Sequence, residues 1–319
     1  MNELLINIIC AFIAKKKNRH KFKEKYSKLS IFEALFLKDL IKINKSLEYL
    51  YYKLDKLDYI KNIEPYIYDN PNDKQIYPNI KILVAYHKPA QLFQHKILLP
   101  IHLGRKIAKE TATTTAGTFT NNDVAVKWLL DNMIGDDTGD NISDLNRLFN
   151  EMTGIYWAWK NYDKIGNPDY IGSYHYRRLF PFDVIKDVVN YDVMMGYAID
   201  RKISVKEWFS EYHTPILCQE MIETLKKIHT DEVEKISHFF NNNVSHYCNM
   251  FIMKKEMFFE YCEWLFPVLF EIKKNVEKIK GKCDDRDIGF CSEYLTGYFL
   301  WNKTQDKDVK CEEVEMIGI

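Results

Sequence analysis

Short apolar runs alternate with longer stretches of helical periodicity along most of the chain. The apolar runs are rich in β-branched or aromatic residues and end at polar or proline-containing segments, which is typical of strands. The predicted strands are 81–86, 170–176, 191–197, 249–253 and 309–316. The predicted helices are 93–110, 124–133, 145–160, 255–278 and 285–301. This alternation predicts an α/β fold, in which a parallel or mixed sheet has helices on both faces.

The first part of the chain has a different pattern. Residues 4–14 are apolar except for Asn7, and residues 15–25 contain seven lysines and arginines. This apolar run is too short to span a bilayer, which needs about twenty residues, and its charge follows it, unlike that of a signal peptide. The order fits a segment that lies on an anionic membrane surface. The alternative is an amphipathic helix that packs on the domain with its basic face in water.

Apolar residues then recur at heptad spacing. They are Leu40, Ile43, Leu47, Leu50, Leu54 and Leu57. The spacing predicts a helix whose apolar seam either pairs with a second copy in a homodimer or packs on its own domain. Pro65, Pro71 and Pro78 end the pattern. We therefore divide the chain into a helical N-terminal segment (1–61), a linker (62–79) and an α/β domain (80–319).

Charge and cysteine content exclude several classes of protein. Lys+Arg and Asp+Glu both number 45, and this balance argues against a nucleic-acid partner. The 7 cysteines form no CxxC pair, so we expect reduced thiols in a cytoplasmic protein. The chain also lacks the motifs GxGxxG, GxxxxGK[ST], GxSxG and HExxH, which mark dinucleotide-binding, P-loop, serine-hydrolase and zinc-protease sites.

Charged side chains follow two predicted strands where the apolar runs end. His175, Arg177 and Arg178 lie at the end of 170–176, and His87 and Lys88 follow 81–86. An unpaired buried charge is costly, and arginine suits bidentate recognition of phosphate. Ligands in such sheets bind beyond the carboxyl ends of strands, so these residues predict a diphosphate site. The alternative is that the two arginines pair with carboxylates of the loop at 135–141.

That loop has the sequence GDDTGDN and carries Asp136, Asp137 and Asp140. Carboxylates of this kind can hold a divalent cation, but the calcium-loop pattern with a distant glutamate is not met. The alternative is a turn that caps the following helix. Glu293 lies in the predicted C-terminal helix. It is either a catalytic carboxylate or an ordinary surface charge.

Six motifs follow one another between Ile80 and Trp301. They are IKILVAYHKP, IGDDTGDNIS, TGIYWAWKN, DYIGSYHYRRLF, NMFIMKKEMFFEYCEWLF and GFCSEYLTGYFLW. In this order they resemble a bacterial family of capsule and exopolysaccharide glycosyltransferases that was long labelled a domain of unknown function. The resemblance implies a GT-A-like fold, in which a Rossmann-type mixed sheet takes a nucleotide sugar at its strand ends. Some members are assigned as galactofuranosyltransferases.

One departure from the GT-A pattern concerns the metal. GT-A enzymes commonly carry Asp-x-Asp at the end of a central strand, where this chain has Ser-Tyr-His-Tyr-Arg-Arg. The resemblance therefore implies that Arg and His replace the divalent cation, and we expect no metal ligands. The family motif SER reads Ser292-Glu293-Tyr294, so the glutamate is kept. Asn249 opens a strand that usually lies near donor and acceptor in such folds.

The residues and the resemblance together imply a membrane-associated glycosyltransferase. Its donor would be a nucleotide sugar, expected to be a UDP-sugar, and its acceptor a saccharide or lipid-linked saccharide of capsule, exopolysaccharide or lipopolysaccharide. Glu293 is the expected base, with His175 and Arg177 at the leaving diphosphate. The expected donor-binding residues are His87, Lys88, Asp140, Asn141, Tyr174, Arg177, Arg178 and Asn249. We expect a peripheral position on the inner face of the bacterial cell membrane. The rival interpretations are a sugar-phosphate transferase of capsule assembly and a non-catalytic assembly scaffold.

Overall fold

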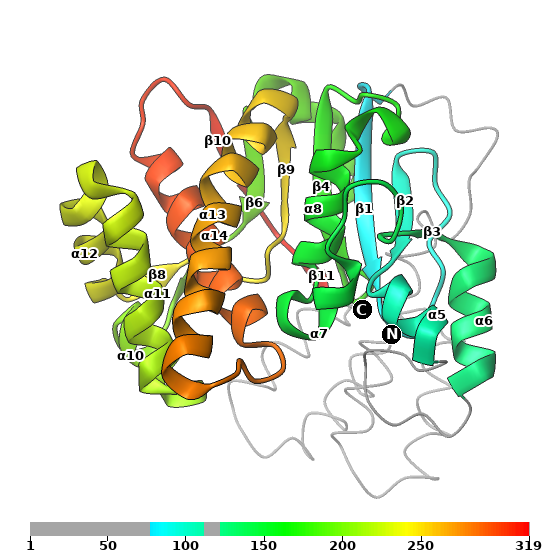
Figure 1. Cartoon of the computed structure of the whole chain (residues 1–319). Coiled ribbons are helices and arrows are strands. Elements are labelled where there is room, and N and C mark those ends of the chain that lie inside the picture. The colour runs from blue at the N-terminus through cyan, green and yellow to red at the C-terminus, as the bar shows by residue number, and fades with distance from the viewer. Residues whose placement is uncertain (1–76, 112–121, 319) are drawn as a thin grey trace, which may run out of the picture. The chain divides into compact units, whose positions relative to one another are not determined.

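The structure is a computed structural model that describes residues 77–111 and 122–318 (Figure 1). The predictions for residues 1–61 and most of the linker lie outside the described residues. The centre of the fold is a 9-stranded mixed sheet. Its strands are β1 (Ile80–Tyr86), β2 (Leu98–His102), β3 (Ile134–Gly135), β4 (Tyr170–His175), β5 (Arg178–Leu179), β6 (Val193–Gly196), β9 (Phe251–Lys254), β10 (Cys311–Val314) and β11 (Ile317–Gly318). A second sheet pairs β7 (Ile199–Asp200) with β8 (Val244–Ser245).

The main sheet has the strand order β10-β6-β9-β4-β1-β2-β3, and β5 joins β11 to β4. All strands on this path run parallel except β9, which is antiparallel to both of its neighbours. The carboxyl ends of β1, β2, β3, β4 and β6 therefore meet at one edge. Because β9 runs in the opposite direction, its first residues lie at that same edge. This edge is where ligands bind in open α/β sheets.

Helices surround the main sheet. They are α5 (Arg105–Thr111), α6 (Asn122–Asn132), α7 (Asn146–Phe149), α8 (Met152–Lys160), α9 (Phe182–Ile185), α10 (Val205–Tyr212), α11 (Pro215–Ile228), α12 (Val233–Asn241), α13 (Lys255–Lys280) and α14 (Asp287–Thr304). Short 3-10 turns lie at Ser143–Leu145, Lys186–Asn190, Thr230–Glu232 and Tyr162–Ile165. Figure 1 shows α7, α8, α13 and α14 over one face of the sheet. Within the described ranges, no helix is both long and apolar enough to cross a membrane.

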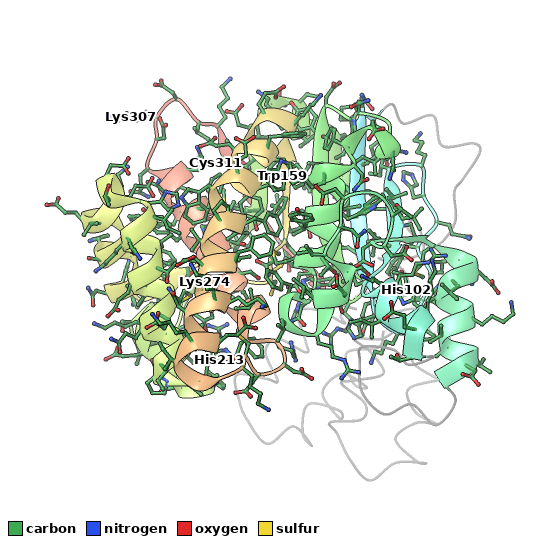
Figure 2. The ribbon with its side chains drawn as sticks, in the orientation of Figure 1. His102, Trp159, His213, Lys274, Lys307 and Cys311 are labelled. Atoms are coloured by element: carbon green, nitrogen blue, oxygen red, sulfur yellow. The ribbon has the colours of Figure 1, made fainter. Side chains whose placement is uncertain are left out.

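Aromatic rings fill the layer between these helices and the sheet. Trp159 of α8 stacks on Phe266 of α13 with ring centroids 5.6 Å apart, and Figure 2 shows Trp159 where the two helices meet. Phe251 of β9 packs edge-on against Tyr261 of α13 at 5.2 Å. Burying rings of this size stabilises the domain strongly. The high aromatic content thus serves this core.

The predicted α/β class with a mixed sheet flanked by helices is confirmed, and four predicted strands match β1, β4, β6 and β9 closely. The helix predicted over 93–110 is wrong in its first half, because residues 98–102 form β2 beside β1. The helix predicted over 145–160 is broken at Asn150, whose φ of 50° lies outside the helical region. This break sets the direction in which α8 leaves the edge of the sheet.

Candidate active site

Three histidines lie where parallel strands end at the carboxyl edge. His175 is the last residue of β4, His102 is the last residue of β2, and His87 directly follows β1. In the strand register His175 lies beside Ala85 of β1. The groups predicted at the ends of two separate strands are therefore neighbours. His102 is not among the predicted residues; it is buried at the end of β2 (Figure 2).

His175 belongs to a polar network that reaches three other elements. Its Nε2 lies 2.7 Å from the carbonyl oxygen of Cys248 and 3.8 Å from Oε1 of Glu151. The same Glu151 oxygen accepts a hydrogen bond from Nδ2 of Asn249 over 2.8 Å. Asn249 Nδ2 also donates to Oγ of Ser292 in α14 over 3.2 Å. Sequence-predicted His175 and Asn249 thus meet through Glu151, which sequence analysis did not single out.

The loop before β9 has an unusual backbone. Cys248 and Asn249 have φ values of 79° and 48°, a left-handed region that asparagine tolerates better than most residues. This conformation points the Cys248 carbonyl at His175 and its amide at α14. The Cys248 N–H donates to Oε1 of Glu293 over 2.8 Å. Two consecutive left-handed residues are strained, and such strain concentrates at functional sites.

Glu293 is the strongest candidate for a base. Burial raises the pKa of its carboxyl, and the negative charge of Glu151 raises it further. The amide of Cys248 and the charges of His175 and Arg178 oppose that shift, but the net pKa stays above its ordinary value. A carboxylate with a raised pKa holds a proton more readily near neutral pH, as general-base chemistry requires.

Cations gather beside this network around the ring of Tyr176. The Lys88 ammonium and the Arg177 guanidinium lie 6.0 Å and 5.4 Å from the ring centroid. His87 meets the same ring edge-on at 5.4 Å. Burial, with the nearby charges of Lys88 and Arg177, lowers the pKa of His87 to about 4. Two cations, Lys88 and Arg177, thus lie close together beside a neutral His87, and a bound anion would offset the repulsion between the two cations.

The two arginines of the HYRR segment differ in their surroundings. Arg177 is exposed, whereas Arg178 is half-buried on β5. Within the described part of the chain, neither guanidinium forms an ion pair. Burial raises the pKa of the Cys248 thiol to about 11, and the charge of Arg178 opposes that shift. Arg178 therefore lies on the side of Cys248 and Glu293, and Arg177 lies on the side of His87.

The GDDTGDN loop has a structural role at its first aspartate. Asp136 is fully buried and accepts hydrogen bonds from the amides of Gly104 and Arg105 at 2.8 Å and 3.1 Å. It also accepts from the hydroxyls of Ser143 and Thr153 at 2.5 Å and 2.6 Å. These donors tie the start of α5 to the loop. The alternative in which Arg177 and Arg178 pair with this loop is wrong for the described residues.

The later residues of the loop contact the loop itself and α8. Asp140 accepts a hydrogen bond from the hydroxyl of Tyr156 over 3.2 Å. Asn141 donates to the carbonyl of Gly139 and accepts from the Ser143 amide. These contacts do not reach His175 or Glu293, so a donor contact by Asp140 and Asn141 stays a prediction. Across residues 77–111 and 122–318, no three His, Cys, Asp or Glu side chains gather as a metal site needs.

Comparison with known protein families gives a match over most of the chain. Residues 81–305 match the family model described as a domain of unknown function, DUF4422. The chain belongs to the DUF4422 family. The match includes every residue of the His175 network and every cation around Tyr176. No curated protein is similar enough to count as a relative.

The DUF4422 domain also resembles a solved structure, the WbbM bifunctional glycosyltransferase in its apo form. The two share 24% sequence identity with a TM-score of 0.59, and the match covers 76% of this chain. It covers 45% of the WbbM chain, so this chain spans less than half of that protein. At this identity the likeness establishes the fold, which is that of a glycosyltransferase domain.

Tyr174 corrects one prediction. Side chains alternate along β4, so Tyr174 points to the face of the sheet opposite His175. It is fully buried there, with its ring edge-on to Phe180 at 5.2 Å. Tyr174 is a core residue and does not line the edge where a donor would bind.

Glu151 and His102 are the polar residues that sequence analysis missed. Glu151 precedes α8 directly, but a continuous helix over 145–160 would have placed it on an ordinary surface turn. Only the break at Asn150 brings its carboxylate to Asn249, which lies far along the chain. His102 carried a usable signal, because it ends an apolar run as His87 and His175 do.

Proposed function

We propose that this DUF4422 domain is a glycosyltransferase that moves a sugar from a nucleotide-sugar donor to a saccharide acceptor. The observation that carries the proposal is the position of Glu293 at the same sheet edge as Lys88, Arg177 and Arg178, which form no ion pair with any described residue. Sugar transfer from a diphosphate donor requires a base for the acceptor hydroxyl and fixed positive charge at the leaving diphosphate. Glu293, whose pKa is raised, and the cations would supply them. The fold likeness to WbbM, which is described as a bifunctional glycosyltransferase, supports the proposal.

The donor would place its diphosphate at Tyr176. Arg177, Lys88 and His87 are donors for phosphate oxygens there, and Arg177 supplies the planar fork that phosphate recognition favours. Charge that develops on the leaving diphosphate would be stabilised by these fixed groups. We expect a UDP-sugar as donor, with galactofuranose as the transferred sugar in line with the family resemblance.

The acceptor would meet Glu293. In an inverting transfer the carboxylate removes the proton from the acceptor hydroxyl as the oxygen attacks the anomeric carbon. The bond to the diphosphate oxygen breaks, and the diphosphate leaves with that electron pair. Growing capsule, exopolysaccharide or lipopolysaccharide chains, free or lipid-linked, are the acceptors that we propose.

A rival activity uses the same cations. A sugar-phosphate transferase of capsule assembly would also hold a diphosphate with Arg177 and Lys88, but its product would keep one phosphate. Mass spectrometry of the product separates the two activities. A scaffold without catalysis would release no nucleotide from any donor.

We also propose attachment to the inner face of the cell membrane through residues 4–25, and pairing of two copies through a helix over residues 36–60. Deletion of residues 1–25 should release the protein from anionic vesicles in a flotation assay and leave donor hydrolysis intact. Leu47→Lys should convert a dimer to a monomer in light scattering. A deleted protein that still floats, or an unchanged mass, would contradict the respective assignment.

The decisive experiment is an activity screen. The full chain is incubated with UDP-, GDP-, CMP- and dTDP-sugars and a panel of oligosaccharide acceptors, with Mn²⁺ or with EDTA. We expect release of UDP and an acceptor heavier by one sugar, also in EDTA. No release from any donor would overturn the proposal, and loss of activity in EDTA with rescue by Mn²⁺ would overturn the metal-free form of it.

A further inference from the structure

A second cation lies on the other side of Glu293. Arg201 directly follows β7, and its guanidinium carbon lies 4.5 Å from the ring centroid of Trp208 in α10. It lies 4.8 Å from the ring centroid of Tyr247. We call these three residues the arginine clamp. Two aromatic rings around a guanidinium stabilise it through cation–π contact.

The guanidinium of the clamp has no anionic partner. Among the described residues Arg201 forms no ion pair, and its Nε is buried without a hydrogen-bond partner. Its backbone amide donates to the carbonyl of Asn243 at 3.0 Å, and its side chain lies within hydrogen-bonding reach of the Tyr247 hydroxyl. Among the described residues, the Nε–H group is the buried donor of Arg201 that is left for a ligand. Buried donors without partners are uncommon in folded proteins and often mark a ligand position.

The clamp connects to Glu293 from two directions. Tyr247 precedes Cys248, whose amide holds the Glu293 carboxylate. The Tyr247 ring also lies edge-on to Tyr294, the residue after Glu293, at 5.7 Å. A group bound by Arg201 would therefore lie beside the base. The charge of Arg201 reaches this loop, because it counteracts the rise that burial causes in the pKa of Cys248.

The strand order separates the clamp from the donor cations. His87 and Arg177 follow β1 and β4, whereas β6, which leads to β7 and Arg201, lies on the far side of β9 from β4. The loop with Cys248 lies between them because it begins β9. The donor diphosphate and the clamp would thus flank Glu293 on opposite sides, which leaves the clamp side for an acceptor.

We propose that Arg201 binds an anionic group of the acceptor, either a sugar carboxylate or a phosphate, and so holds the acceptor hydroxyl at Glu293. This inference rests on the proposed function and adds the acceptor class. A planar arginine fork recognises both kinds of oxyanion. A neutral acceptor would leave the buried Nε–H group of Arg201 without a partner, so the clamp selects against it.

Binding of small probes to the full chain tests the proposal without knowledge of the natural acceptor. Glucuronate, glucose 6-phosphate and neutral glucose are titrated by ligand-observed NMR in the presence of saturating UDP. We expect one of the two anions to bind at least about tenfold more tightly than glucose, because charge-assisted hydrogen bonds contribute roughly that factor. The carboxylate and phosphate arms identify which anion the clamp takes.

Two variants assign the binding to the clamp. Arg201→Gln should abolish the preference for the anion, and Arg201→Lys, which keeps the charge but not the fork, should weaken it by about tenfold. Arg147→Gln, an exposed arginine on α7, is the matched control and should keep the preference. If Arg201→Gln does not fold, Arg201→Lys and the wild-type comparison decide.

Equal binding of the anions and glucose by the wild-type chain overturns the proposal, as does an anion preference that is unchanged in Arg201→Gln or in Arg201→Lys. UDP binding gives a separate readout of the proposed function. UDP that binds without any anion preference leaves the glycosyltransferase proposal standing and removes the clamp. If the chain does not bind UDP but shows an anion preference that depends on Arg201, the anion site stands and the glycosyltransferase proposal is removed.

Discussion

The backbone amide of Cys248 donates a hydrogen bond to Oε1 of Glu293 over 2.8 Å. This contact joins the loop before β9 to the first half of α14 and fixes the direction of the carboxylate. It exists because Cys248 has a φ of 79°, which turns its amide toward the helix. One side of the candidate site is thus set by backbone conformation and the other by the charges at the ends of β1 and β4.

Glu293→Gln should lower kcat by about two to four orders of magnitude, the usual contribution of a general base. Glutamine keeps an oxygen for the Cys248 amide but cannot take a proton, so UDP binding should be unchanged. Steady-state kinetics with Glu234→Gln, an exposed glutamate of α12, as control would test this. Retained turnover would show that another group accepts the proton.

The same variant should not lower the melting temperature. The pKa of Glu293 is raised in the folded state, so its ionised form is penalised by folding at every pH above the unfolded value of 4.5. A neutral glutamine removes that penalty. Thermal unfolding at pH 7.5 should give a melting temperature equal to or above that of the wild-type chain; a clear fall would mean that the ionised carboxylate stabilises the fold.

Glu151→Gln should move the acid limb of the pH–rate profile to lower pH. Glu151 contributes a negative charge that raises the pKa of Glu293, and glutamine can still accept the hydrogen bond from Asn249. Without that charge Glu293 ionises at lower pH and stays active there. The profile of kcat/KM between pH 4.5 and 8 measures the shift. An acid limb at unchanged pH would show that the charge of Glu151 does not affect the pKa of the base.

Arg177→Lys should keep the net charge and the fold, because Arg177 is exposed, and still lose about two orders of magnitude in kcat. Lysine cannot form the two parallel hydrogen bonds that a phosphate accepts from arginine. Arg147→Lys serves as the control for an exposed arginine. Turnover within about twofold of wild type would place the leaving-group contact elsewhere.

Donor binding should be coupled to proton uptake through His87. Its pKa is lowered to about 4 by burial and by Lys88 and Arg177, so it is neutral at pH 6. A diphosphate beside it would favour the imidazolium and raise that pKa. Calorimetry of UDP binding at pH 6 in buffers of different ionisation enthalpy should show the uptake. It should vanish in His87→Gln and persist in His238→Gln, an exposed histidine of α12.

The lowered pKa of His87 also has a consequence for stability. The folded state binds a proton at His87 less readily than the unfolded state does. The contribution of neutral His87 to the free energy of unfolding is therefore complete above pH 6.5 and is lost as the pH falls toward 4. His87→Gln should therefore flatten the decline of the melting temperature between these values. An unchanged slope would mean that His87 is hydrated in the folded protein.

Asp136→Asn should destabilise the domain by about 1.5–3 kcal/mol, because a buried carboxyl group that accepts hydrogen bonds from two amides and two hydroxyls is lost. The Nδ2 group of asparagine would face the backbone amide of Gly104 or Arg105, and two hydrogen-bond donors would then face each other. Urea unfolding measures the loss, and Asp144→Asn, an exposed aspartate of the same segment, is the control. A stable variant that needs Mn²⁺ for activity would move the metal question back to this loop.

Part of the site could be read from the sequence, because its signals are local. An apolar run that stops at His87-Lys88 or at His175-Tyr176-Arg177-Arg178 gives both the strand and the polar group at its end. Parallel strands then bring those ends to one edge, so neighbouring cations at β1 and β4 follow from the pattern alone. Asn249 was found through a motif that resembles a family. Glu293 was a candidate from its place in the predicted C-terminal helix, and the resemblance made it the expected base.

Tertiary structure decided the contacts between residues that lie far apart in the chain. The carboxylate of Glu151 meets Asn249 only because α8 is broken at Asn150 and β9 runs antiparallel between β4 and β6. The face on which Tyr174 lies follows from the register of β4, and Arg201 meets Trp208 and Tyr247 only where β7, α10 and the loop before β9 come together. Local patterns determine strands and helices because neighbouring residues share one backbone conformation. The pKa of Glu293 and the groups that surround each charged side chain depend on burial and on residues distant in the sequence, which come together only in the folded domain.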